Sequence, residues 1–279
     1  MAFKRLFLVL LLCITSHTAL ATRFDHVIWD GLLREHVYMI NEGRASQVNY
    51  HGFAMNHGQL IKYLAQLSQV KKSDFSDWDK SEQLAFLINA YNASTIEMIL
   101  RSYSSIANLR AFAPVNFQWK IRLISMLKNQ RDLNFISLFG EILSLNDIEN
   151  DMIRKRGNYD EPRIHFALNR GSIGYPALRN HAYTGMELEQ RLETATRAFL
   201  SDRSRNRYNE AAEKLEVSEI FDWYTKDFER GWQGWLGLAQ FFTHYRDSLA
   251  DTARTHELLT AENIEIQFLE FNWMLNEKR

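Results

Sequence analysis

The chain has 279 residues, of which 46% are hydrophobic and 24% are charged. This composition supplies a sizeable apolar core and excludes an intrinsically disordered protein. The formal net charge at pH 7 is −1, so no excess of positive charge indicates a nucleic-acid partner. Only 3 prolines and 12 glycines are present, and no Pro/Gly/Ser-rich linker interrupts the chain, which favours one domain over two.

The first 21 residues have the pattern of an export signal. Lys4 and Arg5 form a basic start, an apolar run extends from Leu6 to Ile14, and Ala19-Leu20-Ala21 supplies the small residues of a cleavage site. The run is shorter than the roughly 20 residues that a spanning helix needs. We expect cleavage after Ala21, a single domain over residues 22–279, a periplasmic or secreted location and no stable membrane span. A short membrane anchor or a buried first helix is the alternative.

The single cysteine, Cys13, lies inside this segment. From Thr22 onward the sequence therefore excludes a disulfide, a thiolate nucleophile and a cysteine-bound metal. Export without disulfides fits a bacterial periplasm better than a small secreted fold held by disulfides. If the protein is an enzyme, we expect a hydrolase that does not use a thiol.

Hydrophobic periodicity predicts the main elements. Helices are expected over about Phe24–Val37, His57–Val70, Lys80–Tyr103, Asp147–Arg156, Gly185–Leu200, Glu219–Glu229 and Trp232–Leu249. Strands are expected in a hairpin over Phe135–Ser144 that turns near Gly140, and over Arg163–Asn169, Leu215–Ser218 and Ile264–Phe271. Because these elements mix without βαβ regularity, we expect an α+β fold: one helix-rich domain with a small mixed or antiparallel sheet. Within this class, a papain-like or transglutaminase-like architecture is one candidate for the chain.

The predicted strand from Arg163 to Asn169 is the most informative local pattern. Its period of two places Arg163, His165 and Asn169 on the face opposite the apolar residues. We expect His165 to act as a base or hydrogen-bond donor, and Arg163 and Asn169 to bind an anionic ligand. In the alternative interpretation the strand is purely structural, and its Arg and His pair with carboxylates such as Asp147 or Glu149.

The predicted helix from Lys80 carries a second polar set. Glu82, Asn89 and Asn92 follow the spacing i, i+7 and i+10, so they lie along one side of the helix. Asn89 and Asn92 are candidate catalytic residues because amides can orient a histidine, and Glu82 is a candidate ligand-binding residue. Alternatively, the amides hold the backbone of a loop, or the side is simply solvated.

Known cofactor and metal motifs are missing. The sequence has no Gly-x-Ser-x-Gly elbow, no His-Glu-x-x-His and no phosphate or dinucleotide fingerprint, so we expect no cofactor. His51 and His57 could bracket a metal, but no third ligand follows at a clear spacing, so we expect none. Core packing is the default interpretation of the late aromatic residues, with a sugar-binding platform as the alternative. These residues are Trp223, Tyr224, Trp232, Trp235 and Trp273.

Several blocks of the sequence resemble, in order, the bacterial family called domain of unknown function 547. The blocks are Glu82-Gln-Leu-Ala-Phe-Leu-Ile-Asn89-Ala-Tyr91-Asn92-Ala, Leu145-Asn-Asp147-Ile-Glu149 with Arg154, Glu161–Asn169 continuing through Gly171-Ser-Ile-Gly174-Tyr-Pro176-Ala-Leu-Arg179, Ser218–Phe228 and Phe268–Asn276. The resemblance covers nearly all of the chain after the signal. The family is largely uncharacterised, and its bacterial members often carry export signals.

The resemblance also reveals a departure at two positions. The family usually has two cysteines in the central block, where this chain has Arg170 and Tyr175. A cysteine beside a histidine and an asparagine would imply thiol catalysis of the papain or transglutaminase kind. If relatives are thiol enzymes, the resemblance implies a pseudoenzyme here, and Arg170 adds a permanent positive charge.

Three functions follow from these patterns. The first is a periplasmic binding or pseudoenzyme-like domain in which Arg163, His165 and Arg170 form an anion-favouring cleft beside Asn89 and Asn92, for a small-molecule or peptide ligand. The second is a thiol-independent hydrolase with His165 as general base. The third is a structural protein without a ligand.

Overall fold

The computed structural model describes residues 23–112, 130–262 and 264–278, so the expected export signal and Cys13 lie outside the described residues. The helices are α1 (Val27–His36), η1 (Asn41–Gly43), α2 (Tyr50–Met55), α3 (His57–Ser68), α4 (Lys72–Asp77), α5 (Lys80–Phe112), η2 (Gln130–Asp132), η3 (Asp147–Ile153), η4 (Pro162–Phe166), η5 (Gly185–Glu187), α7 (Leu188–Leu200), α8 (Ile220–Trp223), α9 (Thr225–Phe228), η6 (Trp232–Gly234), α10 (Leu238–His244), α11 (Arg246–Leu249) and α12 (Ala253–Thr260). The strands are β1 (Val37–Ile40), β2 (Ala45–Val48), β3 (Ile136–Leu138), β4 (Glu141–Leu143), β5 (Arg207–Asn209), β6 (Lys214–Ser218) and β7 (Glu265–Leu269).

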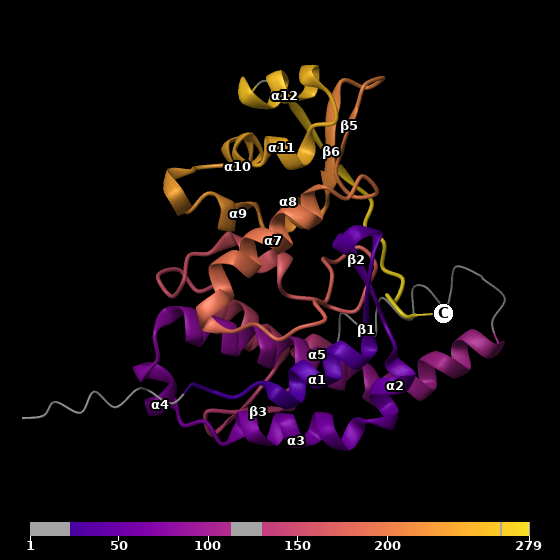
Figure 1. Ribbon diagram of the computed structural model, residues 1–279, viewed down its shortest axis with the longest axis vertical. Helices are drawn as coiled ribbons and strands as arrows, with labels where there is room; N and C mark the ends of the chain where they lie inside the picture. The colour runs from indigo at the N-terminus through magenta and orange to yellow at the C-terminus, as the bar shows by residue number, and fades with distance from the viewer. Residues whose placement is uncertain (1–22, 113–129, 263, 279) are drawn as a thin grey trace, which may run out of the picture.

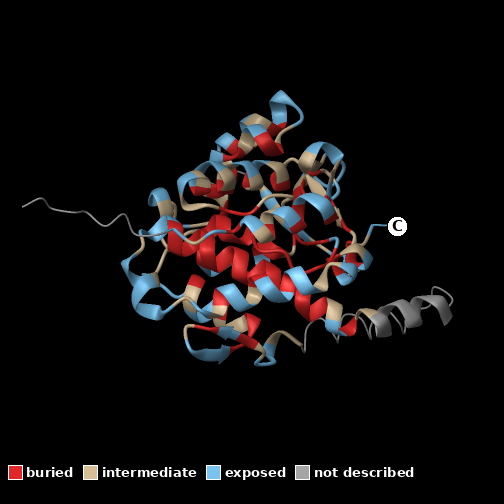
Figure 2. Cartoon of the chain, turned by 60° about the horizontal axis from the view of Figure 1, so that its bottom comes forward, coloured by how far each residue is buried: buried red, intermediate tan, exposed pale blue. Residues whose placement is uncertain are grey.

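Helix α5 is the centre of the first half of the molecule. From Leu84 to Ile99 every residue is buried, and Figure 2 shows this buried helix surrounded by more exposed elements. A helix enclosed in this way is apolar on nearly all sides, which explains why polar residues within it must find partners inside the protein. Helices α2 and α3 pack against α5, and α1 packs in turn against α2 and α3 (Figure 1).

A second core lies under the C-terminal elements. The sheet has the order β5-β6-β7, in which β5 and β6 are antiparallel and β6 and β7 are parallel. Helices α8, α10, α11 and α12 gather with this sheet at the end of the molecule opposite α1 and α3 (Figure 1). The small mixed sheet and the excess of helix confirm the expected α+β class.

The segment after β7 returns to the first half. The N–H of Asn276 donates to the carbonyl of Gly171 over 2.9 Å, and the N–H of Lys278 donates to the carbonyl of Val48 over 2.9 Å. Tyr50 donates from its hydroxyl to Oδ1 of Asn276 over 2.7 Å. In Figure 1 this yellow segment runs from the sheet toward β1 and β2, so it ties the two cores together.

The expected strand from Arg163 to Asn169 is wrong: the structure has the 3-10 helix η4 at this place. Pro162 occupies the start of the helix, and the Glu161 side chain accepts the N–H of Arg163 over 2.9 Å. Pro and a side-chain cap are the standard start of a helical turn. All five residues of η4 are buried, so the alternation of residue types does not mark a solvent-facing side.

The other elements are partly as expected. The hairpin β3–β4 is confirmed, and both of its turn residues, Phe139 and Gly140, have positive φ. The single helix expected over Trp232–Leu249 is wrong, because the chain is interrupted before α10 and Gly231 and Gly234 adopt the left-handed region. The helix expected over Glu219–Glu229 is likewise divided into α8 and α9.

Candidate functional site

The two amides of α5 hold the backbone of other segments. Asn92 donates from Nδ2 to the carbonyl of Ala167 over 3.0 Å and accepts the N–H of Asn169 over 2.9 Å. Asn89 makes the same pair of bonds to one residue, Tyr183, at 2.7 and 3.0 Å. Of the interpretations open from the sequence, this geometry matches the one in which amides hold a loop.

Two candidate ligand-binding residues also contact backbone. Oε2 of Glu82 accepts the N–H of Gly185 over 2.9 Å, and burial raises the pKa of this carboxyl. Asn169 donates from Nδ2 to the carbonyl of Pro176 over 2.7 Å and accepts the N–H of Gly171 over 2.9 Å. Asn169 therefore stabilises the loop that carries three residues of the pocket described below, whereas Glu82 holds the start of η5.

Arg163 lies among carboxylates and not beside His165. Its guanidinium is 2% exposed and pairs with Glu161 and Glu189 at 2.7 Å and with Glu193 at 3.3 Å. Burial alone would lower the pKa of Arg163, but the hydrogen bonds that it donates to Glu161 and Glu189 outweigh burial and raise the pKa. The guanidinium also lies 4.4 Å from the ring centroid of Trp232. Because η4 is helical, the expected common face of Arg163 and His165 does not form.

His165 is buried behind an aromatic ring. Its Nε2 lies 2.7 Å from Oδ2 of Asp227, and its ring stacks on Tyr224 with the centroids 3.9 Å apart. Asp227 also pairs with Arg154 and Arg230, each at 2.6 Å. Burial lowers the pKa of His165 in spite of Asp227, so the imidazole is neutral at pH 7 and its Nε2–H donates to the carboxylate.

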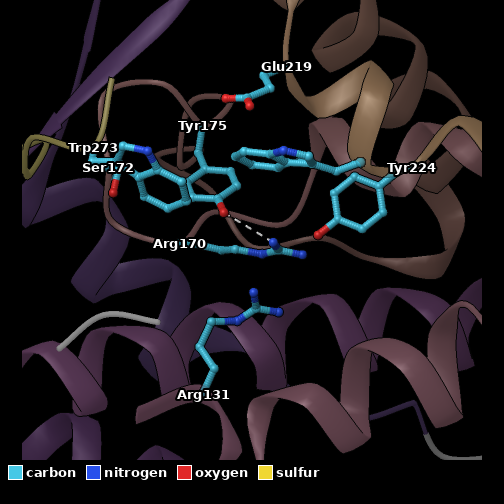
Figure 3. Close-up of a pocket in the computed structure, with 8 residues that line it drawn as sticks. Arg131, Arg170, Ser172, Tyr175, Glu219, Tyr224 and Trp273 are labelled. Carbon is cyan, nitrogen blue, oxygen red and sulfur yellow. Dashed lines mark hydrogen bonds between the residues drawn. The ribbon is translucent and has the colours of Figure 1, made fainter. Parts of the chain in front are cut away.

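A pocket of about 440 Å³ opens between segments that are far apart in the sequence. Figure 3 shows it with the two arginines on one side and Glu219 on the opposite side. Its lining residues are Arg131, Arg170, Ser172, Tyr175, Glu219, Trp223, Tyr224 and Trp273.

Arg131 and Arg170 form the cationic side of the pocket, and their two guanidinium groups share one carboxylate. Arg170 donates to Oε1 of Glu149, and Arg131 donates from Nη2 to Oε2 of Glu149 over 2.6 Å. Arg170 also donates from Nε to the hydroxyl of Tyr91 over 3.0 Å and from Nη1 to the hydroxyl of Tyr175 over 3.1 Å. The Tyr91 hydroxyl in turn donates to Oε2 of Glu149 over 3.0 Å.

The charges of this cluster do not cancel. Burial alone would raise the pKa of Glu149, but Arg170 and Arg131 outweigh it and lower the pKa to about 2, so the carboxylate is ionised at pH 7. One negative charge thus faces two permanent positive charges. The buried Nε–H of Arg131 has no hydrogen-bond acceptor among the described residues. The cationic side therefore keeps both an unmatched charge and an unused donor.

Aromatic rings form much of the remaining wall. Trp223 and Trp273 stack with their ring centroids 5.5 Å apart and an interplanar angle of 29°. The Arg170 guanidinium lies 5.0 Å from the ring centroid of Tyr175 and 5.3 Å from that of Tyr224. Burial raises the pKa of Tyr224 to about 12, so this phenol keeps its proton and can donate.

Two further polar groups line the pocket. Ser172 is 1% exposed, and its buried Oγ has no hydrogen-bond partner among the described residues. Glu219 is half-buried and occupies the N-cap position of α8. Buried polar atoms are normally satisfied, so an open hydroxyl in a pocket wall indicates that a bound molecule or water supplies the partner.

Of the candidate polar site residues from the sequence, the pocket lining includes Arg170, together with the substituted position Tyr175. It also includes Trp223, Tyr224 and Trp273, which the sequence offered as an alternative sugar-binding platform. Sequence reasoning did not single out Arg131, Ser172 or Glu219. Ser172 and Glu219 fall inside the blocks that carry the family resemblance, which is the signal that could have found them. Arg131 falls in no motif, and only the tertiary structure places it at the pocket.

Comparison with known proteins adds the family alone. No curated protein and no solved structure matches the chain. None of the helices in the described part of the chain is long and apolar enough to cross a membrane. The family model described as "Protein of unknown function, DUF547" matches residues 75–200 and confirms the resemblance seen in the sequence over this segment. The segment extends from α4 to the end of α7 and carries Arg131, Arg170, Ser172 and Tyr175.

Proposed function

We propose that this protein binds a small organic anion in the pocket between Arg131 and the paired tryptophans Trp223 and Trp273, and that it acts as a binding domain. The observation that carries this proposal is the unmatched positive charge of Arg131 and Arg170, which share the single carboxylate of Glu149. An anionic group of the ligand would balance this charge.

The donors that would hold the anion are present in the pocket wall. The Nε–H of Arg131 and the hydroxyl of Ser172 both lack partners among the described residues. Hydrogen bonds from a guanidinium to a carboxylate or phosphate are about twice as strong as neutral ones. Arg131 would therefore contribute most of the affinity, and Ser172 would orient the anionic group.

The rest of the ligand would lie against the aromatic rings. A pocket of about 440 Å³ is within the usual range for small-molecule sites. The stacked pair of Trp223 and Trp273 offers a broad apolar face that suits an aromatic ring or the CH face of a sugar. This supports a ring-bearing carboxylate or phosphate as the ligand class, in agreement with the sugar-binding alternative drawn from the sequence.

Binding is favoured over hydrolysis by the surroundings of His165. Its Nε2 donates to Asp227, so that only Nδ1 could act as a base, and the ring of Tyr224 covers one face of the imidazole. A general base needs to reach a substrate proton within about 3 Å or through one water. The pocket lining does not include His165, whereas Arg170 and Tyr175 occupy it where the resembling family has cysteines. A pseudoenzyme that retains only binding accounts for this arrangement.

We also propose that the binding domain is exported, on the basis of the signal pattern in residues 1–21. The pocket would then take its ligand from the periplasm or the exterior. Amino-terminal sequencing of the protein recovered from a periplasmic fraction tests this, and a chain that begins at Thr22 is the expected result.

Calorimetric titration of the protein with matched probes tests the binding proposal. We expect 4-methylbenzoate and glucuronate to bind, and the uncharged 4-methylbenzamide and methyl glucoside to bind at least tenfold more weakly. The Arg131→Met variant should weaken binding of the acids by about tenfold or more, because it removes a charge-assisted donor.

Arg254→Met is the matched control, because Arg254 is 68% exposed and its ion pair among the described residues is with the exposed Glu213. Circular dichroism of each variant establishes that it is folded. Equal affinity for acids and neutral probes, no binding of either, or an unchanged affinity in Arg131→Met would refute the proposal.

A further inference from the structure

The pocket also contains a carboxylate that the anion does not explain. Glu219 lies across the pocket from Arg131 and Arg170, as Figure 3 shows. Its side chain forms no hydrogen bond or ion pair with any described residue, although two arginines line the same pocket. Groups of opposite charge thus face one cavity from its two sides without neutralising each other.

The position of Glu219 in the sequence determines which aromatic residue lies beside it. Glu219 is the N-cap residue of α8, and the N–H of Trp223 donates to its carbonyl over 3.1 Å. Residues spaced i and i+4 lie on the same side of a helical turn. The Glu219 carboxylate and the Trp223 indole therefore face the pocket together, and Trp273 extends this aromatic surface by stacking on Trp223.

A carboxylate beside tryptophan faces is the chemistry that recognises an ammonium group. The π face of an indole attracts a cation, with Trp the strongest of the aromatic side chains, and the carboxylate adds a direct ion pair. An anionic ligand without a positive group would instead meet repulsion from Glu219. The same pocket thus favours a positive group on the ligand at the end away from Arg131.

We infer that the natural ligand is a zwitterion: its carboxylate or phosphate is bound by Arg131 and Ser172, and its ammonium group is bound by Glu219 and Trp223. This inference rests on the proposed function and deepens it by naming the charge pattern of the ligand. Amino acids, short peptides with free ends and amino-sugar acids share this pattern.

The test compares acids that differ only in the ammonium group. We expect 4-(aminomethyl)benzoate or 4-(2-aminoethyl)benzoate to bind about tenfold more tightly than 4-methylbenzoate or 4-ethylbenzoate, respectively. In Glu219→Gln this preference should disappear, while the affinity for 4-methylbenzoate stays the same or rises because a repulsive charge is lost. Glu213→Gln is the matched control, since Glu213 is 70% exposed and lies outside the pocket lining.

Each result separates this inference from the proposed function. If 4-methylbenzoate binds as well as both amino analogues, or if Glu219→Gln keeps the preference, the ligand is an anion without a positive group and this inference is overturned. If none of the acids binds in an Arg131-dependent manner, the anion site itself is absent and both conclusions fail.

Discussion

Arg170 and Tyr175 contact each other directly: Nη1 of Arg170 donates to the Tyr175 hydroxyl over 3.1 Å, and the guanidinium lies 5.0 Å from the centroid of the same ring. These are the two positions at which the family resemblance implies cysteines. Where the resemblance implies two thiols, this chain has one interacting pair, which is joined to Glu149 through Arg170. The stability of this region therefore depends on the Glu149 carboxylate, which offsets part of the charge of Arg131 and Arg170.

Replacing Glu149 by Gln should destabilise the protein by about 3–5 kcal/mol, because Arg170 and Arg131 would then be buried without a counter-charge. The free energy of unfolding in urea measures this loss. Tyr91→Phe is the matched comparison: it removes the hydroxyl that donates to the same carboxylate and should cost only about 1 kcal/mol. A loss in Glu149→Gln no larger than that in Tyr91→Phe would show that the ion pairs contribute little.

The free energy of unfolding should fall as the pH is lowered, over a range that includes the pKa of Glu149. Its pKa in the folded protein is about 2, below the ordinary value of 4.5, so the unfolded chain binds more protons between these values. The stabilisation is complete above about pH 4.5 and is lost as the pH falls through 2. Burial also lowers the pKa of His26 from 6.5 to about 4, so a first loss begins below pH 6.5. Unfolding free energies from pH 7 to pH 2 should therefore decline in two stages. Glu149→Gln should reduce the second stage without abolishing it, because His165 and Arg154 also lower the pKa of Asp227.

The Asn92 side chain should contribute more to the free energy of unfolding than its size indicates. Asn92→Ala leaves the buried carbonyl of Ala167 and N–H of Asn169 without partners, at a cost of about 2–4 kcal/mol. Amide hydrogen exchange at Asn169 should accelerate, because the segment before Arg170 loses its attachment to α5. Asn272→Ala removes a hydrogen bond to the N–H of Met274 at an exposed site and should change stability by under about 1 kcal/mol. Equal losses in the two variants would contradict the anchoring role.

Gly185 should not tolerate even alanine. A Cβ there would lie 2.3 Å from Oε2 of Glu82 and 2.8 Å from the backbone of Glu82. Gly185→Ala therefore forces apart the contact between α5 and η5, and we expect a loss of about 1–3 kcal/mol in urea unfolding. Gly58→Ala is the control, since nothing lies within 4 Å of a Cβ in that helical turn and alanine should stabilise it by about 0.5–1 kcal/mol. A neutral effect at Gly185 would mean that Glu82 moves aside without cost.

The parts of the fold that follow from local pattern could be predicted. The long apolar stripe after Lys80 corresponds to α5, although the helix continues to Phe112, and Gly140 marks the β3–β4 turn. The helical turn that contains Arg163 could not be predicted. Alternation of apolar and polar residues indicates a strand only when one side faces water, and here both sides are buried. The hairpin of β1 and β2 (Val37–Ile40 and Ala45–Val48) was also missed.

The pocket could be predicted only in part. The family resemblance indicates Arg170 as a candidate. Its partner Glu149 lies in another block of that resemblance, but the sequence suggests it as a carboxylate for Arg163 or His165 and not for Arg170. In the structure Glu149 pairs with Arg170 and Arg131, and Asp227 takes His165. Such pairings depend on which distant segments meet, and no local spacing encodes them.

The returning segment after β7 has a consequence for how the protein is made. Tyr50 and Asn276 are 226 residues apart in the sequence, yet they are bonded to each other, and Trp273 of the same segment lines the pocket. During synthesis on the ribosome, an N-terminal portion of the chain can begin to collapse while this last wall has not yet emerged. The pocket that we propose as the ligand site is therefore completed only after Trp273 has emerged. Contacts of such long range make this step slow compared with the formation of α5.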